Sequence, residues 1–181
     1  MKPTRTPGRQ RGTTLVEAAT VTAIVAVVAG LAVPGFGSTI ERRRIEGAAA
    51  QLETDLQLAR AAAVARNDGV RVSFQASEDG SSCYVMHGGA VGDCHCAADG
   101  QPVCSPGAEA LRSAYFGPNA PVRIVANSKS MLFDPVRGTV TPTATAKVQG
   151  RSGAAIHLVI NVMGRVRACS PAPAFPGQKA C

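Results

Sequence analysis

Residues 13–33 read TTLVEAATVTAIVAVVAGLAV, a 21-residue apolar run that contains one charged side chain, Glu17. A helix needs about 20 such residues to cross a hydrocarbon core about 30 Å thick, so we expect a membrane-spanning helix here. A secretory signal has a shorter apolar core that is followed by a cleavage site of small residues. In this chain the small residue, Gly12, precedes the run. A carboxylate near the start of a membrane helix is costly, which marks Glu17 as a functional residue.

A basic leader precedes the apolar run. Residues 1–12 contain four Lys and Arg side chains and no acid, and they contribute to a formal net charge of +7 for the whole chain. Positive charge beside an apolar segment stays on the cytoplasmic side of the membrane. We therefore expect the residues after the run to lie on the opposite side of the membrane, where the length of the chain allows one modest domain.

Three features in register, Gly12, Glu17 and Pro34, resemble the class III signal of type IV prepilins and type II secretion pseudopilins. Members of this family have a basic leader that ends in glycine, and a prepilin peptidase cleaves after that glycine. The resemblance implies a cut between Gly12 and Thr13, which makes Glu17 the fifth residue of the mature chain. Thr13 departs from the pattern, because most members begin the mature chain with an N-methylated phenylalanine.

The resemblance also implies a role for Glu17 in filament assembly. In the family, the glutamate of an incoming subunit pairs with the N-terminal amine of a subunit already in the filament, and a buried carboxylate needs such a cationic partner. The implied partners are other pilin subunits, the prepilin peptidase and inner-membrane lipid. The expected location is the inner membrane, as a single-pass protein with a periplasmic globular domain, and then the pilus outside the cell. A plain membrane anchor, with Glu17 at the lipid headgroups, is the alternative.

Residues 34–66 continue the helix as an amphipathic segment. Apolar residues recur at spacings of seven, four, three and four, which places them on one helix face. These residues are Ile45, Leu52, Leu56, Ala59 and Ala63. Residues 67–69 (NDG) are a helix stop and turn signal, so we expect the helix to end there.

Between residues 67 and 168 the apolar pattern becomes that of β-strands. Short alternating or apolar runs that are bounded by turn residues predict strands. The predicted strands are 70–74, 83–86, 122–125, 131–133, 138–141 and 156–162. Residues 87–110 are rich in Gly, Cys, Ala and Pro and predict a long loop, and the Pro-rich tail 169–181 predicts an irregular chain. A long helix followed by an antiparallel sheet is an α+β fold.

The second half of the helix and the C-terminal strands resemble the GspH/FimT branch of minor pilins. The resemblance rests on residues 56–67 (LQLARAAAVARN), on residues 131–134 (MLFD) followed by Gly138, and on residues 164–167 (GRVR). It spans nearly the whole mature chain and is weak in the cysteine-rich loop, residues 83–104. It implies a pilin-like arrangement in which the long helix packs on the antiparallel sheet.

All six cysteines follow residue 80, and none lies in the predicted helix. They are Cys83, Cys94, Cys96, Cys104, Cys169 and Cys181. An even number in the exported part predicts disulfides made in an oxidising compartment, with 15 possible pairings. The resemblance implies a Cys169–Cys181 bridge, similar to the C-terminal disulfide loops of many pilins, and leaves the other four to pair among themselves.

Residues 94–96 (CHC) could be read as a metal site, but zinc sites usually space their cysteines by two or more residues. We therefore expect disulfides and no metal.

Gly164, Arg165 and Arg167 form a Gly-Arg-x-Arg motif. In the FimT type of minor pilin, this motif is associated with binding DNA for uptake during natural transformation. Two arginines two positions apart in extended chain point to one face, and the planar guanidinium fork suits phosphate. From Arg123 onward the chain has eight Lys and Arg residues and one acid, and Lys179 belongs to the predicted DNA-binding patch. Few aromatic residues are present for base stacking, so the predicted contacts are with the backbone of double-stranded DNA, without sequence preference.

Two kinds of function fit these residues. The first is a minor type IV pilin that assembles into a pilus and binds extracellular DNA. The alternative is a structural or priming minor pilin, or a type II secretion minor pseudopilin, that does not contact nucleic acid. We expect no enzyme activity and no cofactor, because the sequence has no Gly-rich phosphate loop, no Gly-x-Ser-x-Gly elbow and no His-Glu-x-x-His.

Overall fold

The computed structural model describes residues 14–171, 175 and 177–181, and for residues 31–36 it describes the backbone alone. The predicted cleavage site, Gly12 and Thr13, lies outside the described residues. The chain divides into two units, residues 1–39 and residues 40–181, each of which is compact in itself.

The first unit contains the beginning of α1, the helix Leu15–Arg66. Thr14 precedes this helix and caps its first turn, because the backbone N–H of Glu17 donates to Thr14 Oγ1 at 3.3 Å. A threonine followed three residues later by a glutamate is a frequent capping pattern at helix starts. By hydropathy, no helix within the described residues is long and apolar enough to cross a membrane. The membrane span over residues 13–33 therefore stays a prediction.

In the second unit, residues 40–66 of α1 bury one face. The buried side chains on this face are Ile45, Ala49, Leu52, Leu56, Ala59 and Ala63. The helix ends in a Schellman motif, in which Asn67 has a φ of 51° and the N–H of Asp68 donates to the carbonyl of Ala63 at 3.2 Å. Asparagine tolerates this left-handed conformation better than most residues. The predicted helix face and helix stop are confirmed.

The described residues after α1 form eleven strands. They are β1 (Val70–Ala76), β2 (Ser82–His87), β3 (Cys94–Cys96), β4 (Pro102–Cys104), β5 (Ala110–Phe116), β6 (Val122–Ala126), β7 (Ser130–Phe133), β8 (Val140–Thr141), β9 (Ala144–Gly150), β10 (Ala155–Ile160) and β11 (Val166–Cys169). They pair antiparallel in a five-stranded sheet β5-β2-β1-β7-β8, a four-stranded sheet β11-β10-β9-β6 and a ribbon β3-β4.

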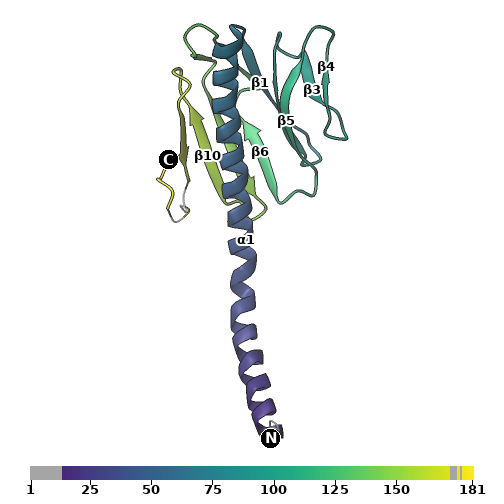
Figure 1. The fold of residues 1–181 in the computed structure, drawn as a ribbon, viewed down its shortest axis with the longest axis vertical. Coiled ribbons are helices and arrows are strands. Elements are labelled where there is room, and N and C mark those ends of the chain that lie inside the picture. Colours follow the sequence, from purple (N-terminus) through teal and green to yellow (C-terminus); the bar gives the residue numbers. More distant parts are fainter. Residues whose placement is uncertain (1–13, 172–174, 176) are drawn as a thin grey trace, which may run out of the picture. The chain divides into compact units, whose positions relative to one another are not determined.

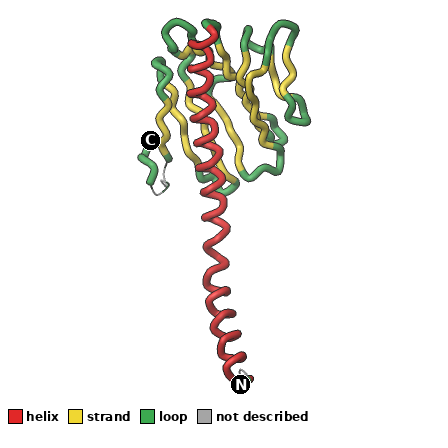
Figure 2. The backbone as a smooth tube through the Cα atoms, in the orientation of Figure 1, coloured by secondary structure: helices red, strands yellow, loops and turns green. Residues whose placement is uncertain are grey.

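One hydrophobic core joins both larger sheets to the second unit's part of α1. The core includes Leu52 and Leu56 from the helix, Phe133 from the five-stranded sheet, and Ile124 and Leu158 from the four-stranded sheet. Figures 1 and 2 show this part of α1 lying along the strands. Burial of apolar side chains between a helix and two sheets is the main stabilising interaction of such a unit. The expected pilin-like α+β fold is confirmed.

The prediction of a long loop over residues 87–110 is wrong in part. This segment contains β3 and β4, which pair with each other, and β5 begins at its end and joins the five-stranded sheet beside β2. The strand pattern is hidden because β3 and β4 are three residues long and carry a cysteine at an end of each strand. Two disulfides supply the constraint that a core would supply to longer strands.

The structure joins the six cysteines as Cys83–Cys96, Cys94–Cys104 and Cys169–Cys181. Cys94 and Cys104 are direct partners in the β3–β4 register, and Cys83 lies on β2. The first two bridges therefore fasten the β3–β4 ribbon across itself and to the five-stranded sheet.

Peptide mapping of the native protein without reductant tests this connectivity. The expected linkages are Cys83–Cys96, Cys94–Cys104 and Cys169–Cys181, because each bridge joins cysteines that strand pairing or the folded tail brings together. A linkage of Cys83 to Cys94, or free thiols at residues 94 and 96 in oxidised protein, would contradict the arrangement of the ribbon.

The described part of the C-terminal tail is fastened to the second unit. Beyond the Cys169–Cys181 bridge, Ser170 and Ala180 form a parallel β-bridge. Phe175 is buried in the hydrophobic core, and the Arg42 guanidinium lies 5.5 Å from the centre of its ring, within cation–π range. The irregular tail is therefore held at its ends by backbone pairing and in the middle by one aromatic side chain.

A buried polar cluster connects α1 to the five-stranded sheet. The Asp55 carboxylate is 1% exposed and accepts a 2.6 Å hydrogen bond from the Tyr84 hydroxyl. Arg112 Nε lies 2.9 Å from Asp55 Oδ1 in an ion pair whose geometry is not that of an aligned hydrogen bond. Burial, and next the hydrogen bond to Asp55, raise the pKa of Tyr84 above its ordinary value, so this hydroxyl stays protonated as a donor.

Candidate functional site

The site begins with the hairpin that joins β10 to β11. Its loop is a tight turn, since the N–H of Gly164 donates to the carbonyl of Asn161 at 2.9 Å. The backbones of Asn161 and Arg165 then close the hairpin: the Asn161 N–H donates to the Arg165 carbonyl at 3.1 Å, and the Asn161 carboxamide accepts from the Arg165 N–H at 2.9 Å. This side-chain contact fixes the backbone from which the Arg165 side chain emerges.

Gly164 is required by its conformation and by its surroundings. Its φ is +70°, in the left-handed region that favours glycine, as is usual for a turn that ends in a bulge. A Cβ atom at this position would lie 3.0 Å from the carbonyl oxygen of Gly138. The chain therefore turns sharply at Gly164, and a larger side chain there would push the hairpin away from the 134–138 turn.

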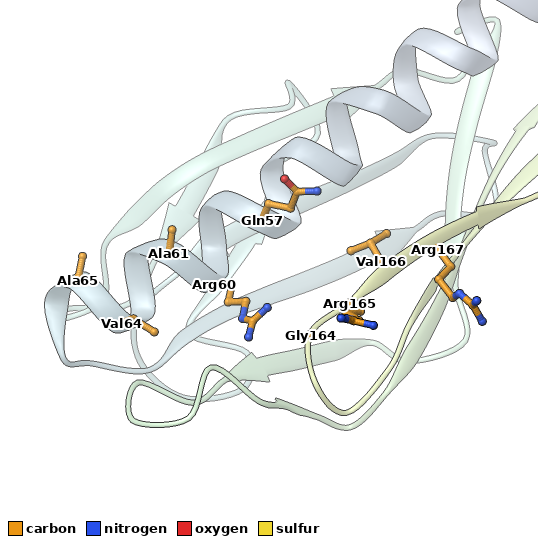
Figure 3. Close-up of a pocket in the computed structure, with 9 residues that line it drawn as sticks. All are labelled: Gln57, Arg60, Ala61, Val64, Ala65, Gly164, Arg165, Val166 and Arg167. Carbon is orange, nitrogen blue, oxygen red and sulfur yellow. The ribbon is translucent and has the colours of Figure 1, made fainter.

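Arg165 and Arg167 are both exposed, and Val166 between them packs against the hydrophobic core. Figure 3 shows the two guanidinium groups on one side of the hairpin strand and Val166 on the other. Alternation along an extended chain produces this arrangement. In β11, Arg167 is the direct partner of the exposed Val159 of β10, so its side chain extends over the outer face of the four-stranded sheet.

A groove lies between the last turns of α1 and this hairpin, with a volume of about 920 Å³ (Figure 3). Its lining residues are Gln57, Arg60, Ala61, Val64, Ala65, Gly164, Arg165, Val166 and Arg167. Three of these are arginines and none is acidic. Within the described part of the chain, Arg60, Arg165 and Arg167 form no ion pair. No side chain that lines the groove neutralises the positive charge of these arginines. The groove can therefore attract an anion.

Arg60 is the member of this group that the sequence did not single out. It lies in the helix segment 56–67, more than 100 positions before Arg165, and only the packing of α1 against the hairpin brings the two together. The position of Arg60 in the helix is the sequence signal that could have identified it. Arg60 directly follows the buried Ala59, so it lies at the border of the buried helix face.

Other predicted site residues lie elsewhere. Lys179 is exposed, but its carbonyl accepts from the N–H of Ser170 at 2.8 Å, which places it at the opposite end of β11 from Arg165. Glu17 is exposed in the first turn of α1, in the other unit of the chain. Cys94 and Cys96 are in disulfides, so neither offers a thiolate to a metal. No cluster of three or more metal-ligating side chains occurs among the residues that the structure describes.

His157 lies on the outer face of the same sheet, where its direct strand partners are Lys147 and Cys169. Partial burial, and next the charge of Lys147, lower the pKa of His157 below its ordinary value. The ring is therefore mostly neutral at pH 7, and the positive charge of this face comes from its Lys and Arg residues.

Comparison with known proteins places these features in a family. Residues 48–164 match the family described as type II transport protein GspH, and the match ends directly before Arg165. No curated protein matches the chain. The fold is similar to the crystal structure of the type IV minor pilin FimU from Pseudomonas aeruginosa, with a TM-score of 0.51 and 21% sequence identity over 73% of this chain and 96% of that one. At this identity the likeness concerns the fold alone.

Proposed function

Since this chain belongs to the GspH family and is a minor pilin or pseudopilin with the pilin-like fold, we propose that it is a minor type IV pilin that binds extracellular double-stranded DNA. Arg165 and Arg167, presented by the turn at Gly164, make the contacts. The family and the fold are those of structural proteins, and DNA binding needs no catalysis.

The observation that carries the proposal is the pair of exposed, unneutralised arginines on one side of a fixed hairpin. Guanidinium groups donate two hydrogen bonds in the geometry of a phosphate, which makes arginine well suited to a nucleic-acid backbone. Phe175, the aromatic residue nearest to the motif in sequence, is buried in the core and does not offer a stacking surface for bases. Backbone contacts without base stacking predict binding that is independent of sequence.

The assembly of the protein into a pilus belongs to the same proposal. The prepilin peptidase cleaves between Gly12 and Thr13, residues 13–33 cross the inner membrane once, and the second unit lies in the periplasm before assembly. Glu17 then pairs with the N-terminal amine of a neighbouring pilin subunit, because a carboxylate in an apolar surrounding needs a cationic partner.

Mass spectrometry of the protein from native membranes tests the processing. The expected chain begins at Thr13, with or without an N-methyl group. A chain that retains Met1, or one that is cut after residue 30 as in a secretory signal, would contradict the prepilin assignment.

The double change Arg165→Gln and Arg167→Gln tests the DNA-binding part. In titrations of labelled duplex DNA with the full chain in nonionic detergent, we expect a parent dissociation constant on the order of 10⁻⁴–10⁻⁶ M at physiological salt. The double variant should lose about two units of the slope of log K against log salt, since each lost phosphate contact removes about 0.9. Lysine at both positions should restore the slope and only part of the affinity, because the charge returns without the fork.

Arg151→Gln is the matched control, because it removes one exposed positive charge from the β9–β10 turn, at the opposite end of β10 from the motif. It should leave both the slope and the affinity within about twofold of the parent, since an exposed charge more than a Debye length of about 8 Å away is largely screened. If the double variant binds as the parent does, the motif does not bind DNA. The description of the matched family, type II transport protein GspH, would then favour a secretion pseudopilin or a structural subunit.

A further inference from the structure

Two glycines leave room for the side chain of Arg60. A Cβ atom on Gly138 would lie 2.9 Å from Arg60 Nε, and one on Gly164 would lie 3.3 Å from Arg60 Cδ. Both glycines have positive φ, +61° and +70°, and they belong to different turns. The stem of Arg60 therefore packs against two backbone surfaces, and this packing limits the conformations that its guanidinium can adopt. A side chain that is restrained before binding loses less conformational entropy when it binds.

The charge around Arg60 differs from that around other arginines of the second unit. Arg66, also on α1, has Glu109 at 3.8 Å, and Arg112 has Asp55 at 2.9 Å. Arg60 is half-buried and faces the same groove as Arg165 and Arg167, and among the described residues none of the three has an acidic partner. Like charges around one groove repel each other, so an anion between them is stabilised by all of them.

The shape of the groove fits a phosphate group that belongs to a longer chain. Its volume of about 920 Å³ is open to solvent along the hairpin, and Gln57, three residues before Arg60, adds a carboxamide that can donate to an oxygen (Figure 3). Arg60 and Arg165 reach the groove from opposite walls, one from α1 and one from the hairpin. A tetrahedral phosphate accepts hydrogen bonds on several sides and can be held by two such forks.

We propose that Arg60 is a third DNA-contacting residue and that Arg60 and Arg165 together bind one phosphate of the backbone in this groove, while Arg167 contacts a neighbouring phosphate over the outer face of the sheet. This inference rests on the proposed function and adds a helix residue outside the Gly-Arg-x-Arg motif. It also assigns a role to Gly138 and Gly164, which leave the space that the Arg60 side chain occupies.

The test measures binding of labelled duplex DNA to the full chain in nonionic detergent, across a series of salt concentrations, for Arg60→Gln, Arg60→Lys and the control Arg151→Gln. Arg60→Gln should reduce the slope of log K against log salt by about 0.9 and weaken binding about fivefold at 0.15 M salt. Arg60→Lys should keep the slope and bind more weakly than the parent, because the charge stays and the fork is lost. The control should match the parent.

Results that differ from these expectations distinguish an error in the Arg60 contact from an error in the proposed function. If the Arg165 and Arg167 double variant loses the slope but Arg60→Gln binds as the parent does, the third contact is wrong and the proposed function stands. If none of these variants changes DNA binding, the third contact and the proposed function are both wrong. If Arg60→Gln lowers incorporation into filaments while DNA binding is unchanged, the groove takes an acidic group of a neighbouring subunit instead. If Arg60→Gln fails to fold, Arg60→Lys decides, and affinity equal to that of the parent would overturn the inference.

Discussion

Replacing Arg112 by methionine is expected to lower the free energy of unfolding by about 3 kcal/mol, because the Asp55 carboxylate would stay buried without its cation. The Tyr84 hydroxyl would still donate its 2.6 Å hydrogen bond, but one neutral donor does not offset a buried charge. Urea unfolding followed by tyrosine fluorescence measures the loss directly, since the chain has two tyrosines and no tryptophan.

Two further variants separate the buried charge from other causes. Adding Asp55→Asn to Arg112→Met should recover at least about 1 kcal/mol, because a carboxamide accepts from Tyr84 and carries no charge. Arg66→Met breaks an ion pair whose two side chains are both exposed, at 3.8 Å, and should cost about 0.5 kcal/mol or less. Equal losses for Arg112→Met and Arg66→Met would show that Asp55 does not depend on Arg112.

Leu56→Ala should lower the free energy of unfolding by about 2–5 kcal/mol, because the side chain is 1% exposed between α1 and the sheets. Leu58→Ala is the matched control on the same helix, since Leu58 is 45% exposed and should lose about 1 kcal/mol or less. The same urea titration serves for both. A loss at position 58 as large as that at position 56 would contradict the helix face.

That helix face was predictable because the information is local. The spacing of Leu52, Leu56 and Ala59 follows the helix period, and Asn67 ends the helix by its own tolerance of positive φ. Strands such as β1 and β10 were predictable for the same reason, because their apolar residues alternate or run together between turn residues.

The strands that the sequence did not reveal lack this signal. β9 buries Ala144 and Ala146, and alanine has a low preference for strands, so its apolar pattern is weak. β5 follows the cysteine-rich segment and has no fully buried residue in its span. β5 pairs with β2, and β9 pairs with β6 as well as with the adjacent β10, and the pairings with β2 and β6 join segments about 20 or more residues apart, which no local pattern reports.

The candidate site likewise contains residues that the sequence revealed and one that it did not. Gly164, Arg165 and Arg167 lie within four consecutive residues, so alternation in an extended chain already placed the two arginines on one face. Arg60 reaches them only through the packing of α1 on the β10–β11 hairpin, and two glycines from separate turns leave room for it. Its part in the site could not follow from the sequence, because a lone arginine on a helix is usually a solvated one.

Arginine footprinting of the full chain tests the central claim, that this cluster binds the DNA backbone. A dicarbonyl reagent modifies exposed guanidinium groups, and mass spectrometry compares the extent at each arginine with and without duplex DNA. Contact with phosphate should slow modification of Arg165 and Arg167 strongly and that of half-buried Arg60 measurably, while exposed Arg151 keeps its rate. Protection that is lost at high salt would agree with backbone contacts. Modification rates at Arg165 and Arg167 that do not change when duplex DNA is added at saturating concentration would contradict the account.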